Sequence, residues 1–181
     1  MLRLIAGHGQ LEFHLWGPRS RDESNVGSDE SLEAAAFLRA LETMPNVRLH
    51  GSVRPATLAN EMSDVDLLLM CYAVERDPNR GCNSHKLLEY LSTGRVVVAN
   101  YVSDYADKPG LIEMVAADGR DKLVDLFDAV IRDLDRYNDP EHRQRRLAFA
   151  LDNSYSKQID RIEICARQLS PPATRREHAH V

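Results

Sequence analysis

The chain has 181 residues, which indicates one domain, or one domain plus a tail, with a core of useful size. Charged residues make up 28% of it and the net charge is −5, which argues against a nucleic-acid partner or an anionic-membrane surface. No apolar run approaches the roughly 20 residues that cross a bilayer, the N-terminus lacks a signal-peptide pattern, and the three cysteines are too scattered for a zinc or CxxC motif, which together favour a reduced, cytoplasmic setting.

Short apolar runs closed by Gly or Pro predict strands along the chain, and apolar residues at three- and four-residue spacing predict helices. In chain order we expect a strand at 11–16, a loop at 18–29, a helix over 32–41, a strand at 47–50, a helix at 56–62, a strand at 65–72, a helix from residue 83, a strand at 95–100, a short strand around 111–115, and helices at 121–137, 140–151 and 155–169. Residues 1–169 are expected to form one domain. Residues 170–181, rich in Pro, Arg and His, are expected to be a disordered tail.

Strands that alternate with helices, several of them continuous apolar runs, predict a buried parallel sheet with helices on both faces. This is a doubly wound, Rossmann-like α/β fold. Ligands of such folds bind beyond the carboxyl ends of the strands. The loops after Trp16, His50, Tyr72 and Asn100 are therefore the places where we expect a site.

The helix that follows Tyr72 begins with an unusual first turn. Asn83 or Ser84 can cap it, yet His85 and Lys86 follow at once, where the backbone is already electropositive. Free amides and cations that converge in this way suit an anion such as a phosphate. The alternative is that both side chains reach into solvent and that Lys86 pairs with Glu89 three residues on.

The order VRLHGSV, DVDLLLMCY and NSHKLLEYLSTGRVVVAN resembles the C-terminal, nucleotide-sugar-binding domain of GT-B glycosyltransferases, in particular the glycosyltransferase 4 (group 1) family. The closing segment FALDNSYSKQIDRIE is similar to that family's last helices. The resemblance covers residues 11–169. It implies a retaining, hexosyltransferase-like enzyme of polysaccharide biosynthesis, with a UDP- or GDP-sugar as the donor and no metal.

The resemblance also implies roles for residues of this chain at matching positions. Glu89 would bind the donor ribose, and Lys86 and Ser84 would stabilise the departing diphosphate and so act as catalytic residues. The remaining donor-binding residues would be Asn83 beside the diphosphate, Gly51 and Val53 beside the nucleobase, and Asn100 and Tyr101 near the sugar or phosphates.

The chain departs from the family pattern in two ways. Family members often carry a further Glu eight residues before the ribose-binding one, where this chain has Gly81, which puts the sugar contact in doubt. The first, central strand of the family's domain and its basic loop are also absent, since residues 1–6 look like the end of the helix that follows that strand. Its loss would leave two buried edges unpaired, on the strands at 11–16 and 65–72.

Several other signals carry little weight. Asp64 and Asp66 spell the D-x-D of metal-dependent glycosyltransferases, but they precede their strand at the end away from the ligand edge. The run from Gly7 to Gly9 lacks the third glycine of a dinucleotide fingerprint. The remaining candidates are two tail histidines that could hold a stray metal and one cysteine near the predicted site, namely His178, His180 and Cys82.

Two functions remain open from the sequence. The first is the donor-binding part of a retaining glycosyltransferase that transfers a sugar to a glycan or lipid-linked acceptor and is inactive alone. The second is a non-catalytic nucleotide-binding module, or the donor-binding subunit of a split, two-chain glycosyltransferase. Both leave the acceptor-binding domain to another domain or partner chain, and the unpaired edges predict poor stability or self-association.

Overall fold

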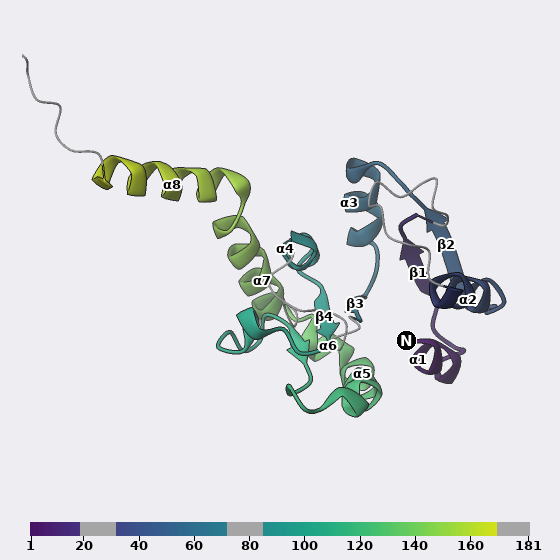
Figure 1. The fold of residues 1–181 in the computed structure, drawn as a ribbon. Helices are drawn as coiled ribbons and strands as arrows, with labels where there is room; N and C mark the ends of the chain where they lie inside the picture. Colours follow the sequence, from purple (N-terminus) through teal and green to yellow (C-terminus); the bar gives the residue numbers. More distant parts are fainter. Residues whose placement is uncertain (19–31, 72–84, 170–181) are drawn as a thin grey trace, which may run out of the picture.

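The computed structural model describes residues 1–18, 32–71 and 85–169 (Figure 1). Its strands are β1 (Phe13–Trp16), β2 (Val47–Gly51), β3 (Leu67–Met70), β4 (Val96–Ala99) and β5 (Glu113–Met114). Its α-helices are α1 (Leu2–Gly7), α2 (Leu32–Glu42), α3 (Pro55–Ser63), α4 (His85–Leu91), α5 (Leu123–Arg132), α6 (Leu134–Tyr137), α7 (Pro140–Asp152) and α8 (Tyr155–Leu169). Most of the predicted loop at 18–29, the predicted strand end at Tyr72 and the predicted tail lie outside the described residues.

All the described strands pair in parallel, but they form two separate sheets. β1 pairs with β2 in one sheet, and β4 lies between β3 and β5 in the other. β1 and β3 are not hydrogen-bonded to one another, and no other described strand lies between them. The predicted α/β class is confirmed, and the edges of β1 and β3 that the resemblance expects to be unpaired have no partner among the described strands.

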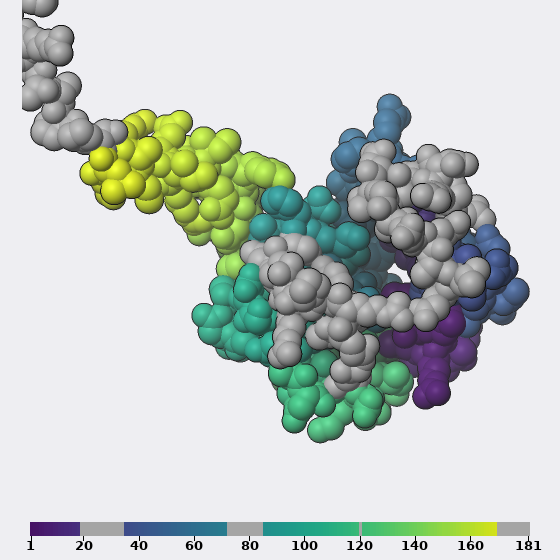
Figure 2. Space-filling model, viewed as in Figure 1, coloured from purple at the N-terminus to yellow at the C-terminus, as the bar shows by residue number. Residues whose placement is uncertain are grey.

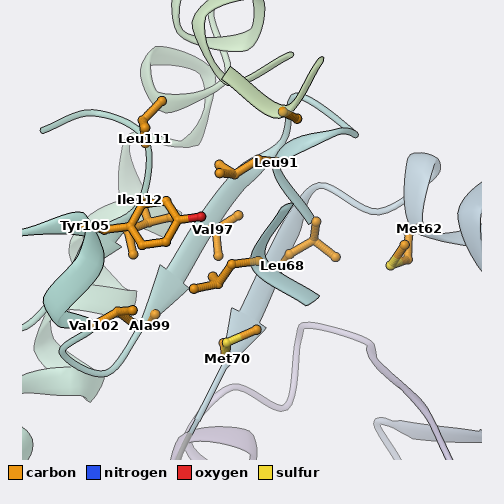
Figure 3. Close-up of a cluster of buried hydrophobic side chains, with 12 residues drawn as sticks. Met62, Leu68, Met70, Leu91, Val97, Ala99, Val102, Tyr105, Leu111 and Ile112 are labelled. Atoms are coloured by element: carbon orange, nitrogen blue, oxygen red, sulfur yellow. The ribbon is translucent and has the colours of Figure 1, made fainter. Parts of the chain in front are cut away.

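Strand β4 is the centre of the larger sheet. Each of its four residues is buried, as a continuous Val-Val-Val-Ala run requires when helices cover both faces. Two of its side chains, Val97 and Ala99, pack with Leu91 of α4 in one cluster (Figure 3). The other two pack with Phe127 of α5 in a second cluster. This half of the protein therefore has the two covered faces of a doubly wound sheet.

The smaller sheet is covered differently on its two faces. On one face, Ile5 of α1, Leu41 of α2 and Val47 of β2 form a third buried cluster. Because side chains alternate along a strand, the opposite face carries the polar and ring-bearing residues of β1 and β2 and their flanks. They are Glu12, His14, Trp16, Arg48 and His50. This face is only partly covered.

A buried histidine joins the two halves. His8 follows α1, and its Nδ1 lies 2.7 Å from the Leu4 carbonyl while its Nε2 lies 2.6 Å from the Asp128 carboxylate of α5. Both contacts are to oxygen atoms, a backbone carbonyl and a carboxylate. The ring also meets Phe127 edge-on, with centroids 5.0 Å apart. This contact holds α1, which lies with the smaller sheet, against the helix that covers the larger one.

The predicted single helix over residues 121–137 is wrong. The chain forms a 3-10 turn, η3 (Arg120–Lys122), then α5, and it breaks at Asp133 (φ −125°, ψ 36°) before α6. The break presents Asn138 to the amino ends of β3 and β4. Its side chain donates to the Asp66 carbonyl and accepts from the Val96 N–H, each at 2.8 Å, which extends the pairing of the two strands by one step.

Arg146 of α7 is fully buried and ties three segments to that helix. Its guanidinium donates to the carbonyls of Leu111 at 3.3 Å, Gly94 at 3.2 Å and Tyr137 at 2.7 Å. Burial lowers the pKa of Arg146, and the nearby charges of Glu113 and Asp139 oppose that shift. Burying this cation costs solvation free energy, and its hydrogen bonds to the three carbonyl groups offset that cost.

We expect Arg146→Met to lower the free energy of unfolding by about 2–4 kcal/mol, because it leaves three carbonyls without their donor at buried or partly buried sites. Arg145→Met, at the exposed neighbouring position on α7, is the matched control and should change stability by less than about 0.5 kcal/mol. Urea unfolding followed by circular dichroism measures both. Equal losses in the two variants would contradict the assigned role.

Tyr105 gives a pH-dependent test of the core cluster around β4. Burial, with the nearby charge of Asp104, raises the pKa of Tyr105 to about 12. An unfolded tyrosine titrates near 10, so the contribution of Tyr105 is complete below pH 10 and is lost as the pH rises toward 12. Between those values the free energy of unfolding should fall more steeply for the wild type than for Tyr105→Phe. Tyr155→Phe, at an exposed tyrosine, should keep the wild-type slope.

Candidate functional site

A cavity of about 740 Å³ lies between the two sheets. Its sides are β1 and β3, and it extends to the turn after β2 and to one side of α4. In the space-filling view the purple and blue N-terminal elements lie on one side of this part of the molecule and the teal and green ones on the other (Figure 2). The cavity therefore follows the gap between β1 and β3 and reaches the carboxyl ends of the strands, where a ligand is expected.

Three of the predicted site residues meet in this cavity. Val53 reaches it from the turn between β2 and α3, and Lys86 and Glu89 reach it from α4. The two α4 residues are three positions apart, so they lie on one side of the helix, and both are exposed. They form no ion pair with one another, but their exposure is also what the alternative expects, in which the side chains reach into solvent. A lysine, a glutamate and a turn residue thus line one cavity.

The remaining predicted residues are placed less directly. Gly51 ends β2 with a φ of 72°, a left-handed conformation that favours glycine, and so aims the Val53 turn at the cavity without lining it. Asn100 and Tyr101 follow β4 at the same carboxyl edge but do not line the cavity. The backbone N–H of Asn100 donates to the Met70 carbonyl at 3.3 Å. Asn83 and Ser84, with Gly81 and Cys82, lie outside the described residues.

His85 does not point into the cavity. Its Nε2 lies 2.9 Å from the hydroxyl of Tyr155, at the start of α8, and the two rings are 5.0 Å apart. The contact with Tyr155, 70 residues later in the sequence, therefore explains why His85 stands in the first turn of α4. Of the two cations that the sequence places in that turn, Lys86 alone lines the cavity.

The sequence did not single out the residues of β1 that line this space. Trp16 lines it, and its indole ring lies parallel to the His50 ring, with centroids 4.9 Å apart and an interplanar angle of 13°. The indole N–H donates to Glu61 of α3, which fixes the ring. Its position in the sequence could have indicated this role, because Trp16 ends the first predicted strand at the edge where ligands are expected. Cys71, after β3, also lines the cavity, and burial raises the pKa of its thiol.

Residues 1–162 match the model of a family described as glycosyl transferase-like. The chain belongs to this family. No curated protein matches it in sequence. Among solved structures, it is similar to the crystal structure of Anabaena Alr3699/HepE in complex with UDP-glucose, with 15% identity and a TM-score of 0.65. The match covers 92% of this chain and 44% of that one, so the chain spans less than half the length of that protein.

At this level of identity the likeness shows the fold, which is the Rossmann-like GT-B architecture of a glycosyltransferase. The Rossmann-like fold predicted from the sequence is therefore confirmed. Its D-x-D sequence, Asp64 to Asp66, borders the cavity at the amino end of β3, away from Lys86 and Glu89. Within the described ranges no three His, Cys, Asp or Glu side chains are grouped so that they could hold a metal ion.

Two further observations concern motifs and membranes. The Gly7 to Gly9 run lies at the end of α1 and just after it, where His8 makes the contact with Asp128 described above. The histidines of the predicted tail lie outside the described residues.

In the part of the chain that the structure describes, none of the helices combines the length and apolar character that a membrane span needs.

Proposed function

We propose that this chain is the donor-binding part of a retaining glycosyltransferase that uses a nucleotide-diphosphate sugar. The observation that carries the proposal is the convergence of Val53, Lys86 and Glu89 on one cavity at the carboxyl edge of the sheet. Membership of the glycosyl transferase-like family supports it, as does the similarity to a protein whose structure holds UDP-glucose. UDP and GDP sugars are the candidate donors.

Each of the three residues has a chemical role in this proposal. The backbone turn at Val53 lies beside the nucleobase. The Glu89 carboxylate accepts hydrogen bonds from the ribose hydroxyls, and the Lys86 ammonium contacts the diphosphate. Ser84 adds a hydroxyl donor to the same diphosphate, and Asn83, Asn100 and Tyr101 complete the surroundings of the phosphates and sugar.

The proposed chemistry is a group transfer in which charge develops on the leaving diphosphate. The bond between the anomeric carbon and the diphosphate oxygen breaks, a bond from that carbon to an acceptor hydroxyl oxygen forms, and the hydroxyl proton passes to an oxygen of the departing diphosphate. Lys86 and Ser84 stabilise the negative charge that grows on the diphosphate, so the step needs no metal. Their contribution is greatest where water is excluded from the cavity.

Acceptor binding is proposed to come from another domain or a partner chain. The chain spans less than half of the similar structure's length. Helix α8 extends away from the body (Figure 1), has no buried residue, and exposes apolar side chains. They include Tyr155, Ile159, Ile162 and Leu169. Spacings of four, three and seven residues place these side chains on one stripe, as in a helix that packs against another unit.

A setting in the cytoplasm and a place in polysaccharide biosynthesis complete the proposal, with a glycan or lipid-linked acceptor. The second candidate function is a nucleotide-binding subunit that is never catalytic by itself, as in a split, two-chain glycosyltransferase. The exposed stripe on α8 and the open edges of β1 and β3 favour it over a free-standing enzyme. The same open edges favour self-association of the isolated chain.

We expect UDP or GDP to bind weakly in the cavity. Calorimetric titration of both nucleotides should show binding that weakens about tenfold in Lys86→Ala and in Glu89→Ala, because each removes a charge-assisted contact of roughly 1.4 kcal/mol. Lys157→Ala and Glu141→Ala, at exposed positions far from the cavity in α8 and α7, are the matched controls and should bind as the wild type does. Wild-type affinity in both cavity variants would place the nucleotide elsewhere.

We also expect the isolated chain to transfer no sugar. Positioning an acceptor against the donor contributes on the order of 7–11 kcal/mol to such a reaction, and the proposal assigns that task to another unit. A donor-turnover assay with UDP-glucose and a range of glycan acceptors measures it, with buffer as the reference. Acceptor-dependent release of UDP well above the reference rate would show that the chain is a complete enzyme.

A further inference from the structure

The two ends of helix α4 are held in different ways. Its buried side carries Leu87 and Leu91, which are fully buried and pack in one cluster with Ala150 of α7. The first-turn residues His85 and Lys86 are exposed, so this core does not anchor them. Helix ends fray where packing does not hold them, and the position of Lys86 therefore depends on contacts made outside the core.

The contact between His85 and Tyr155 supplies such an anchor. The imidazole Nε2 lies 2.9 Å from the tyrosine hydroxyl, and the two rings are tilted by 39° with centroids 5.0 Å apart. Successive residues of a helix are rotated by about 100° from one another. A His85 ring held against α8 therefore limits the directions open to the neighbouring Lys86 side chain, which lines the cavity.

The chemistry of this pair lets the hydrogen bond persist when the histidine gains or loses a proton. A phenol hydroxyl can both donate and accept, whereas an imidazole nitrogen does one or the other. The Tyr155 hydroxyl donates to Nε2 when that nitrogen carries no proton, and it accepts from Nε2 when the nitrogen is protonated. Phenylalanine at this position would keep the ring contact and lose the hydrogen bond in either state.

The start of α8 is itself fixed to α7, which gives Tyr155 a firm support. The Arg161 guanidinium of α8 donates to the Asp152 carboxylate, at the end of α7, at 2.7 Å. The Asn153 side chain, between the two helices, donates to the Phe149 carbonyl of α7 at 2.9 Å. A series of contacts thus runs from the buried side of α7 through α8 to the first turn of α4.

We propose that Tyr155 is a positioning residue for the donor site, which acts through His85 to hold Lys86 in place for the diphosphate. The inference rests on the proposed function, in which Lys86 contacts that group. Tyr155 does not line the cavity, so it acts only through the first turn of α4. The contacts assigned to Glu89, one turn further along the helix, and to the Val53 turn do not depend on it. Losing the Tyr155 hydroxyl should therefore weaken the binding of the diphosphate and of no other part of the ligand.

The test compares UDP with uridine, which lacks the diphosphate, in NMR titrations of the whole chain. We expect Tyr155→Phe to weaken UDP binding about threefold, as the loss of one modest hydrogen bond does, and to leave uridine binding unchanged. The double variant with Lys86→Ala should bind UDP no more weakly than Lys86→Ala alone, because the positioned group is already absent. Tyr137→Phe, at a tyrosine of α6 that does not line the cavity, is the matched control and should bind both ligands as the wild type does.

A second readout needs no nucleotide. The α-carbon chemical shifts of His85 and Lys86 should move toward random-coil values in Tyr155→Phe, while that of Leu91 stays helical. Unchanged shifts at the first two residues would overturn the inference.

Three binding results would also overturn the inference. They are wild-type UDP affinity in Tyr155→Phe, an equal loss of UDP and uridine binding, and a loss that adds in full to that of Lys86→Ala. Wild-type UDP affinity in Lys86→Ala would contradict the proposed donor site and this inference with it. A tenfold loss in Lys86→Ala with none in Tyr155→Phe would contradict this inference alone.

Discussion

The structure depends on how a parallel sheet satisfies its backbone. Every buried N–H and C=O must find a partner, and leaving one without a partner costs about 1–3 kcal/mol. In the larger sheet the condition is met: β4 is paired on both sides and its four residues are buried. At the facing edges of β1 and β3 it is not met by any described strand. The cavity lies between these two edges, and residues of α1, α3 and α5 also line it.

Side chains hold the two halves together in place of backbone pairing. His8 connects the exit of α1 to Asp128, and the Phe13 and Phe127 rings stack with centroids 6.1 Å apart. On the other face, the Trp16 indole donates to Glu61 of α3. The arrangement keeps the carboxyl ends of the strands in position, so that the Val53 turn and the Lys86 side of α4 still face one space.

Much of this arrangement follows from local patterns in the sequence. The apolar runs of β3 and β4 predict buried parallel strands, and the polar residues after the strands predict the ligand edge. Lys86 and Glu89 were identifiable because a cation in the first turn of a helix contradicts the helix dipole, and a resemblance to a family gave Glu89 a role. The position of the open edges followed from that same resemblance, through the strand it implies to be absent.

The contacts that the sequence does not reveal are long-range ones. His85 is explained by Tyr155, 70 positions later, and no local rule pairs them. No Pro or Gly precedes the break at Asp133, and no local pattern predicts the contacts that Asn138 then makes with two strands. The sequence pattern places Trp16 in a strand. It lines the cavity because no described strand pairs with that edge of β1. Such features depend on which elements meet, and this is decided by the whole fold.

The central claim is that the open edge of the sheet and the nucleotide site are parts of one cavity. A crystal structure of the chain grown with UDP tests it most directly. The account predicts β1 and β3 still unpaired with each other, the diphosphate within contact of Lys86, and the ribose against Glu89. A UDP molecule bound away from α4, or a sheet in which β1 pairs directly with β3, would contradict it.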